Sequence, residues 1–150
     1  MKIQDPPGEH LHPIINLYTQ GFLQQALSES SQMLERFPNS IILYNIAGAS
    51  NSGLMQFDDA IESYKQVLKI KPDYAEAYYN MGVALKSKGN PEAAIDSYKQ
   101  ALKIKPDYIG VYSNTCEAYE KSNKLAELSE VISRAKAELK EFTDDLLLYE

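Results

Sequence analysis

The sequence predicts an all-α solenoid in which antiparallel helix pairs stack side by side. The first observation is an internal repeat, since residues 58–74 and 92–108 are identical at 13 of 17 positions and begin 34 residues apart. The second is that apolar residues recur at helical spacing from His10 onwards. The third is that turn-forming residues separate the helical segments. Helices this short are marginal alone in water, so each pair must bury its apolar stripe against its neighbours.

Composition bounds the class of protein before any motif is considered. The chain has 150 residues, of which 44% are hydrophobic and 24% are charged, as in ordinary globular domains. Its single cysteine, Cys116, excludes a disulfide within the chain. No signal sequence or membrane-length apolar run is found, and the net charge of −6 lacks the basic clustering of a nucleic-acid surface. We expect a cytoplasmic protein with neither membrane nor nucleic acid as partner.

The first unit follows a short irregular segment. Residues 1–9 contain two prolines and a glycine without periodicity, which favours a disordered leader. Apolar spacing predicts a helix over His10–Thr19, with Pro13 tolerable only in its first turn, and Gly21 ends it. A second helix is predicted over Leu23–Arg36, before Pro38.

The two middle units are the clearest. In the second, one helix carries Tyr44 through Leu54 and the next carries Ala60 through Leu68. In the third, Gly89 suits a left-handed turn, Asn90 can cap the following helix and Pro91 can occupy its first turn. Asp73 and Glu76 have the spacing of a capping box at the start of this unit.

The fourth unit is weaker but keeps the register. Asn123 takes the place of the turn glycine, and the following helix is expected to run to about Glu141, with Thr143 capping a further or terminal helix over 143–150. The predicted repeat domain therefore spans residues 10–142, with units at about 7–40, 41–74, 75–108 and 109–142.

This 34-residue pattern resembles the tetratricopeptide repeat. The third unit carries the family's small and aromatic positions, and the second unit matches it with Met55 where the turn glycine belongs. The matching residues of the third unit are Tyr78, Gly82, Leu85, Gly89, Ala94, Tyr98, Ala101 and Pro106. The resemblance implies a right-handed superhelix of about four units. Its concave face would be lined mainly by the first helix of each pair, and its ligand would be a protein or peptide.

The family's groove positions can be carried over one by one. Asn80 and Asn114 lie one repeat apart, where asparagines of the family often bind a peptide main chain, whereas Asn45 is displaced by one position. Recognition of a carboxylate would need several basic residues, and only Lys86 and Lys121 are placed for it. The peptide-binding candidates are Asn45, Glu76, Tyr79, Asn80, Val83, Lys86, Ser113, Asn114, Glu117 and Lys121, with Ala49 and Ser52 beside them.

Signals for catalysis and cofactors are weak. His10 and His12 have no cysteine or carboxylate cluster to complete a metal site. Residues 48–53 superficially resemble a nucleophile elbow, but they lie inside a helical repeat and follow no strand. The tyrosines spaced by one repeat favour core packing over base stacking. We therefore expect no catalytic residues, no metal and no cofactor.

The sequence thus favours a non-catalytic protein-interaction scaffold. One alternative is the repeat segment of a larger enzyme, similar to those that precede glycosyl- or sulfotransferase domains. The other is self-association through the terminal helices, because the end at Leu146–Tyr149 lacks the polar outer face that a solenoid terminus needs.

Overall fold

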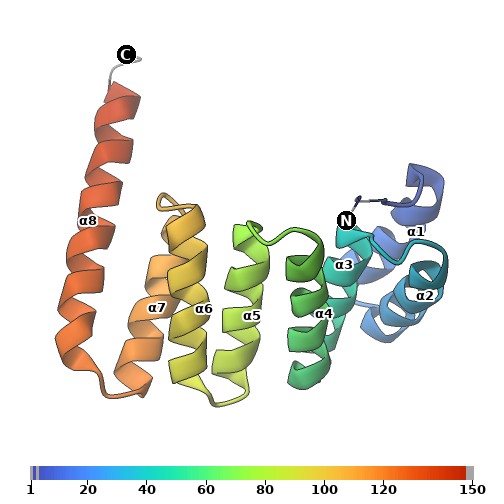
Figure 1. Ribbon diagram of the computed structural model, residues 1–150, viewed down its shortest axis with the longest axis horizontal. Helices are drawn as coiled ribbons and strands as arrows, with labels where there is room; N and C mark the ends of the chain where they lie inside the picture. The colour runs from blue at the N-terminus through green and yellow to red at the C-terminus, as the bar shows by residue number, and fades with distance from the viewer. Residues whose placement is uncertain (1, 3, 148–150) are drawn as a thin grey trace.

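A computed structural model describes residues 2 and 4–147 of the chain. These residues form eight helices and no strand, and Figure 1 shows the helices side by side in a row, with α8 at one end. The helices are α1 (Gly8–Thr19), α2 (Leu23–Arg36), α3 (Ile41–Gly53), α4 (Phe57–Ile70), α5 (Ala75–Ser87), α6 (Pro91–Ile104), α7 (Ile109–Lys121) and α8 (Leu125–Leu147). The predicted all-α solenoid is confirmed.

The odd-numbered helices form the inner layer of the stack. Each helix packs against the next along the chain, and α1 also contacts α3, α3 contacts α5, and α5 contacts α7. Within the described ranges, no two even-numbered helices make such a contact. Because the odd-numbered helices approach one another more closely, the stack curves toward them. They therefore line the concave face.

Small residues facing aromatic rings set the close approach of the helices. Tyr98 of α6 is 0% exposed, and a Cβ on Gly82 of α5 would lie 2.5 Å from its Cε1 atom. One repeat earlier, Gly48 of α3 meets the ring of Tyr64 of α4 in the same way, with 2.7 Å to Cε1. Only glycine at these positions lets the ring lie directly on the neighbouring helix.

The turns between paired helices mostly follow the predicted chemistry. Gly89 has φ +92°, and Asn90 accepts a hydrogen bond from the Ala93 amide at 3.1 Å, so it caps α6 as predicted. Asn123 adopts φ 56° and Met55 adopts φ 62°, so both replace the turn glycine without loss of the turn. The prediction of a capping box at Asp73 and Glu76 is wrong, because α5 begins at Ala75 without a side-chain cap.

The N-terminal segment, predicted as a disordered leader, contacts the start of α3 through Asp5. The Asp5 carboxylate accepts hydrogen bonds from Ser40 Oγ at 2.6 Å and from the Ile42 amide at 3.3 Å, at the start of α3. Residues 1 and 3 lie outside the described residues. The first helix begins earlier than predicted, at Gly8, so Pro13 lies inside α1 rather than in its first turn. Pro13 has no N–H, and the Glu9 carbonyl therefore lacks the usual helical donor.

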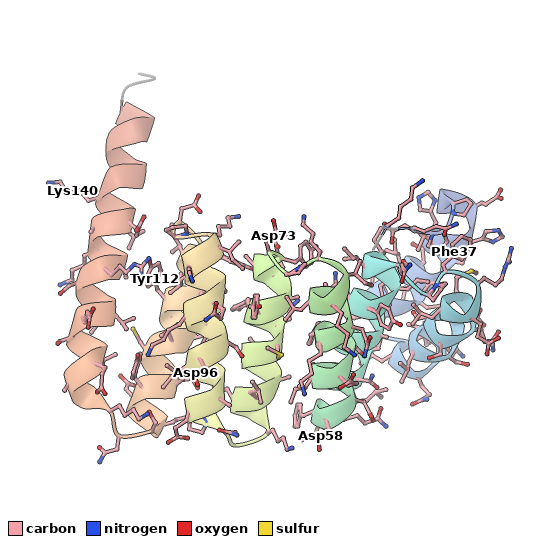
Figure 2. The ribbon with its side chains drawn as sticks, in the orientation of Figure 1. Phe37, Asp58, Asp73, Asp96, Tyr112 and Lys140 are labelled. Atoms are coloured by element: carbon pink, nitrogen blue, oxygen red, sulfur yellow. The ribbon has the colours of Figure 1, made fainter. Side chains whose placement is uncertain are left out.

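The last helix is also longer than predicted. The backbone of α8 runs without interruption from Leu125 to Leu147, so it neither ends near Glu141 nor restarts at Thr143. Residues 148–150 of the predicted further helix lie outside the described residues. Figure 1 shows α8 extending beyond the ends of its neighbours. Where α7 and α8 pack, Tyr112 lies between them, and its hydroxyl donates to the Pro106 carbonyl at 3.0 Å (Figure 2).

Charged residues on the even-numbered helices face outward. Figure 2 shows Asp58 at the start of α4 and Asp96 on the surface of α6, and both side chains are exposed. The lysines of α4 and α6, which are Lys65, Lys69, Lys99 and Lys103, are exposed as well. No helix among the described residues combines the length and the apolar character that a membrane span requires.

Candidate functional site

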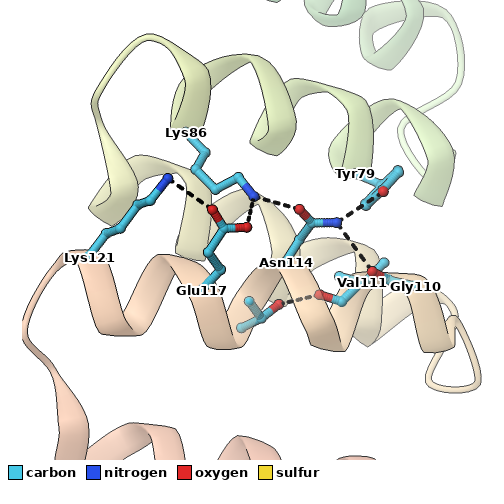
Figure 3. A network of polar contacts seen from close by, with 8 residues as sticks. Tyr79, Lys86, Gly110, Val111, Asn114, Glu117 and Lys121 are labelled. Atoms are coloured by element: carbon cyan, nitrogen blue, oxygen red, sulfur yellow. Dashed lines mark hydrogen bonds and ion pairs between the residues drawn. The ribbon is translucent and has the colours of Figure 1, made fainter.

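Five of the predicted groove residues form one polar network between α5 and α7 (Figure 3). Lys86 Nζ donates to Asn114 Oδ1 at 2.6 Å and lies 2.5 Å from Glu117 Oε2. Lys121 Nζ lies 2.9 Å from the other carboxylate oxygen, Glu117 Oε1. Asn114 Nδ2 donates to the Tyr79 hydroxyl at 3.1 Å. The network joins the third and fourth helix pairs across the floor of the concave face.

The two asparagines one repeat apart are not equivalent. Asn114 is fully engaged, since Nδ2 also approaches the Gly110 carbonyl at 3.4 Å and Oδ1 accepts from Lys86. The side chain of Asn80 in α5 is half-buried and makes no hydrogen bond with any described residue. An amide carries two donors and one acceptor oxygen, so Asn80 is the group of this pair that can bind a main chain directly.

Aromatic residues surround Tyr79, the residue that precedes Asn80 in α5. The rings of Tyr79 and Tyr108 lie with their centroids 5.2 Å apart, and Tyr79 also contacts Tyr98 at 6.1 Å. Burial raises the pKa of Tyr108, and the nearby carboxylate of Glu76 raises it further. Rings with a polar edge at the wall of a groove suit a ligand that is apolar on one side and hydrogen-bonding on the other.

The remaining candidates are more dispersed. Asn45 Oδ1 is buried and has no donor among the described atoms, while Ser113 is exposed. Val83 packs against the core cluster that contains Tyr98. Ser52 lies within hydrogen-bonding reach of the Tyr64 hydroxyl, where burial raises the pKa of Tyr64 to about 12. These residues do not join the network between α5 and α7.

Comparison with known families agrees with this architecture. A family model described as "TPR repeat" matches residues 56–89, and one described as "Tetratricopeptide repeat" matches residues 75–108. Residues 56–108 therefore belong to the tetratricopeptide repeat family. The second match covers the whole of the third repeat, from the first residue of α5 to Tyr108. Tyr79, Asn80 and Lys86 therefore lie on the first helix of a tetratricopeptide repeat.

Curated relatives match the chain over part of their own length. The chain is 34% identical over 76 residues to the probable UDP-N-acetylglucosamine–peptide N-acetylglucosaminyltransferase SEC of Arabidopsis thaliana. It is 28% identical over 67 residues to small glutamine-rich tetratricopeptide repeat-containing protein 2 of Saccharomyces cerevisiae. These matches cover 51% and 45% of this chain, but only 8% and 19% of the two relatives.

Solved structures show the same tetratricopeptide repeat fold over most of the chain. A crystal structure of MamA superposes with a TM-score of 0.84 at 23% sequence identity, covering 90% of this chain and 79% of that one. A second MamA crystal structure gives a TM-score of 0.83 with the same coverage of this chain. At this identity the likeness concerns the fold alone.

Sequence reasoning missed the pairing within the network and the state of the Tyr98 hydroxyl. Tyr98 lies in the core, and its buried hydroxyl has no hydrogen-bond partner among the described atoms. At the equivalent place one repeat earlier, Ser52 is within reach of Tyr64, and the residue equivalent to Ser52 is Lys86. The sequence indicates this difference in one way: serine at position 52 is replaced by lysine at the equivalent position 86.

The network predicts a pH dependence that can be measured directly. Hydrogen bonds from Lys86 and Lys121 lower the pKa of Glu117 to about 2, below the value of about 4.3 for an unfolded glutamate. The stabilisation is therefore complete above pH ~4.3 and is lost as the pH falls through about 2. Glu117 is 47% exposed, so salt weakens the effect. A ¹³C NMR titration should place the Glu117 carboxyl midpoint near 2, and a midpoint near 4.3 would contradict the network.

Proposed function

We propose that this chain is a non-catalytic protein-interaction scaffold that binds an extended peptide segment on its concave face. The tetratricopeptide repeats and the solenoid fold support the scaffold role. The observation that carries the binding site is the side chain of Asn80, which lies on an inner helix with no hydrogen bond to any described residue. An amide in this state can pair with both the N–H and the C=O of a peptide.

The aromatic wall gives this site a second kind of contact. Tyr79 precedes Asn80 in α5, and its ring lies 5.2 Å from that of Tyr108, which immediately precedes α7. We propose that a peptide whose main chain is held by the Asn80 amide also places a side chain against these tyrosine rings. Binding at micromolar strength, about 8 kcal/mol, is typical of such peptide recognition.

The test is the selection of a binding peptide and its titration against matched variants. A peptide chosen from a random library on the immobilised protein is titrated by calorimetry into the wild type, Asn80→Ala and Gln100→Ala. Gln100 is an exposed amide on outer helix α6 and serves as the control. Loss of the Asn80 hydrogen bonds should weaken binding roughly tenfold, about 1.4 kcal/mol, and Gln100→Ala should leave it unchanged. Equal affinity for all three proteins would refute the site.

A second candidate is that the chain is the substrate-positioning segment of a larger enzyme. The match to the Arabidopsis thaliana transferase, 34% identical over 76 residues, favours it. Its groove would then hold the polypeptide that the enzyme modifies. The mass of the natural protein purified from its source decides between the two, because a mass far above that of 150 residues supports the enzyme. A mass equal to that of this chain would exclude it.

Self-association through the terminal helices is the third candidate. The observation that favours it is an apolar groove of about 280 Å³ between α7 and α8, which is lined by Ile109, Ile132 and Leu139 among others. Light scattering on the chain and on a Leu139→Glu variant, which places a charge in this groove, tests this candidate. It predicts an oligomer for the wild type, and a monomer in both cases would remove it.

A further inference from the structure

The cationic part of the concave face is occupied by a carboxylate of the chain itself. Each oxygen of Glu117 contacts one ammonium group, Lys86 Nζ at 2.5 Å and Lys121 Nζ at 2.9 Å (Figure 3). The Lys86 side chain is only 11% exposed, whereas Glu117 and Lys121 are 47% and 55% exposed. The ammonium of Lys86 is thus held below the surface, and the side chain of Glu117 covers it.

Removal of this carboxylate would leave Lys86 without its anionic partner. An ammonium that is mostly buried and loses its counter-ion is unfavourable, so the vacated position would attract another anion. A small carboxylate bound there would accept hydrogen bonds from Lys86 Nζ and Lys121 Nζ, the two groups that now contact Glu117. A ligand carboxylate and Glu117 therefore compete for one position.

We propose that Glu117 is a specificity-determining residue: it acts as a built-in carboxylate that occupies the Lys86–Lys121 pair and excludes acidic ligands from this part of the groove. The consequence for peptide binding rests on the proposed function. With Asn114 and Lys86 engaged by each other, the free main-chain site is the part around Asn80. Ligands that place a neutral or apolar residue over Glu117 are favoured over acidic ones.

Chemical rescue with acetate tests this exclusion without any peptide. Glu117→Ala removes the built-in carboxylate and leaves space where it stood, and alanine is favourable inside a helix. Sodium acetate is titrated at constant ionic strength into ¹⁵N-labelled wild type and Glu117→Ala, and the Asn114 side-chain amide is followed by NMR. Glu117→Ala should bind acetate saturably, at least tenfold more tightly than the wild type, with Kd on the order of 10 mM.

Three controls make the result specific. Acetamide, which is neutral and has the same shape, should not saturate in Glu117→Ala. Glu120→Ala, an exposed acid on the same helix, should behave as the wild type. Lys86→Ser introduces the residue that the preceding repeat has at the equivalent position, Ser52. Combined with Glu117→Ala, it should abolish acetate binding. Circular dichroism checks that each variant is folded, and Glu117→Ser serves as a second variant if the alanine protein is not.

Two outcomes would overturn the proposal. One is saturable acetate binding by the wild type as tight as by Glu117→Ala, because Glu117 then excludes nothing. The other is no acetate binding by a folded Glu117→Ala protein, because Lys86 and Lys121 then form no anion site. Neither outcome bears on the peptide titration with Asn80→Ala, so a failure here and a failure of the proposed function can be told apart.

Discussion

Replacing Tyr98 by alanine is expected to lower the free energy of unfolding by about 3–5 kcal/mol. The ring is 0% exposed and belongs to the core cluster of α6 and α7, with Ala94, Leu102 and Val111. Its removal leaves a cavity that the surrounding helices can fill only in part, so contacts on several neighbours are lost together. Urea unfolding followed by circular dichroism at 222 nm measures the change.

Tyr98→Phe separates the ring from the hydroxyl. The Tyr98 hydroxyl is buried without a partner among the described atoms, so its removal should leave the stability unchanged or raise it by up to about 1 kcal/mol. Tyr64→Phe is the matched variant one repeat earlier. It loses a hydroxyl within reach of Ser52 and should cost about 0.5–1.5 kcal/mol. A large loss for Tyr98→Phe would show that its hydroxyl is hydrogen-bonded after all.

The second large effect is expected at Gly82, which packs against the same ring. A Cβ at this position would lie 2.5 Å from Tyr98 Cε1 and 2.7 Å from Cδ1, closer than unbonded carbon atoms can come. The fully buried ring has no free space to move into. Gly82→Ala should therefore destabilise the protein by about 1–3 kcal/mol, although alanine is otherwise the better helix former.

Gly110→Ala is the matched control in the next inner helix. Gly110 is the second residue of α7, and a Cβ there would have no atom within 4 Å. This substitution should stabilise the protein by about 0.4–1 kcal/mol, because it lowers the entropy of the unfolded chain. The opposite signs of the two glycine substitutions are the result to look for in urea unfolding. Equal effects would mean that Gly82 does not determine how closely α5 and α6 approach.

The repeat architecture could be predicted because each of its determinants is local. Apolar spacing, the turn at Gly89, Asn90 and Pro91, and the small residues opposite aromatic rings all lie within one 34-residue unit. Because the units at 41–74 and 75–108 share one pattern, the boundaries of the units before and after them follow from the 34-residue spacing. Asn123 could be recognised as a turn residue for the same reason, since few residues other than glycine adopt a positive φ at low cost.

The features that could not be predicted depend on contacts between distant residues. Asp5 accepts a hydrogen bond from Ser40, 35 positions away, and nothing in the composition of the N-terminal segment indicates this contact. In the groove, Lys86 meets Glu117 across 31 positions and two different helices. The spacing identified both as groove residues, but nothing in a single unit shows that each neutralises the other. Their pairing is what makes Asn80 and Asn114 differ.

The most direct test of peptide binding on the concave face is the side-chain amide resonance of Asn80. A library-selected peptide is titrated into the ¹⁵N-labelled protein, and the side-chain amides of Asn80 and Gln100 are followed together. We predict that the Asn80 Nδ2 resonances shift saturably with the Kd measured by calorimetry, while those of Gln100 stay in place. Saturation of the protein with peptide while the Asn80 resonances do not move would contradict the proposed site.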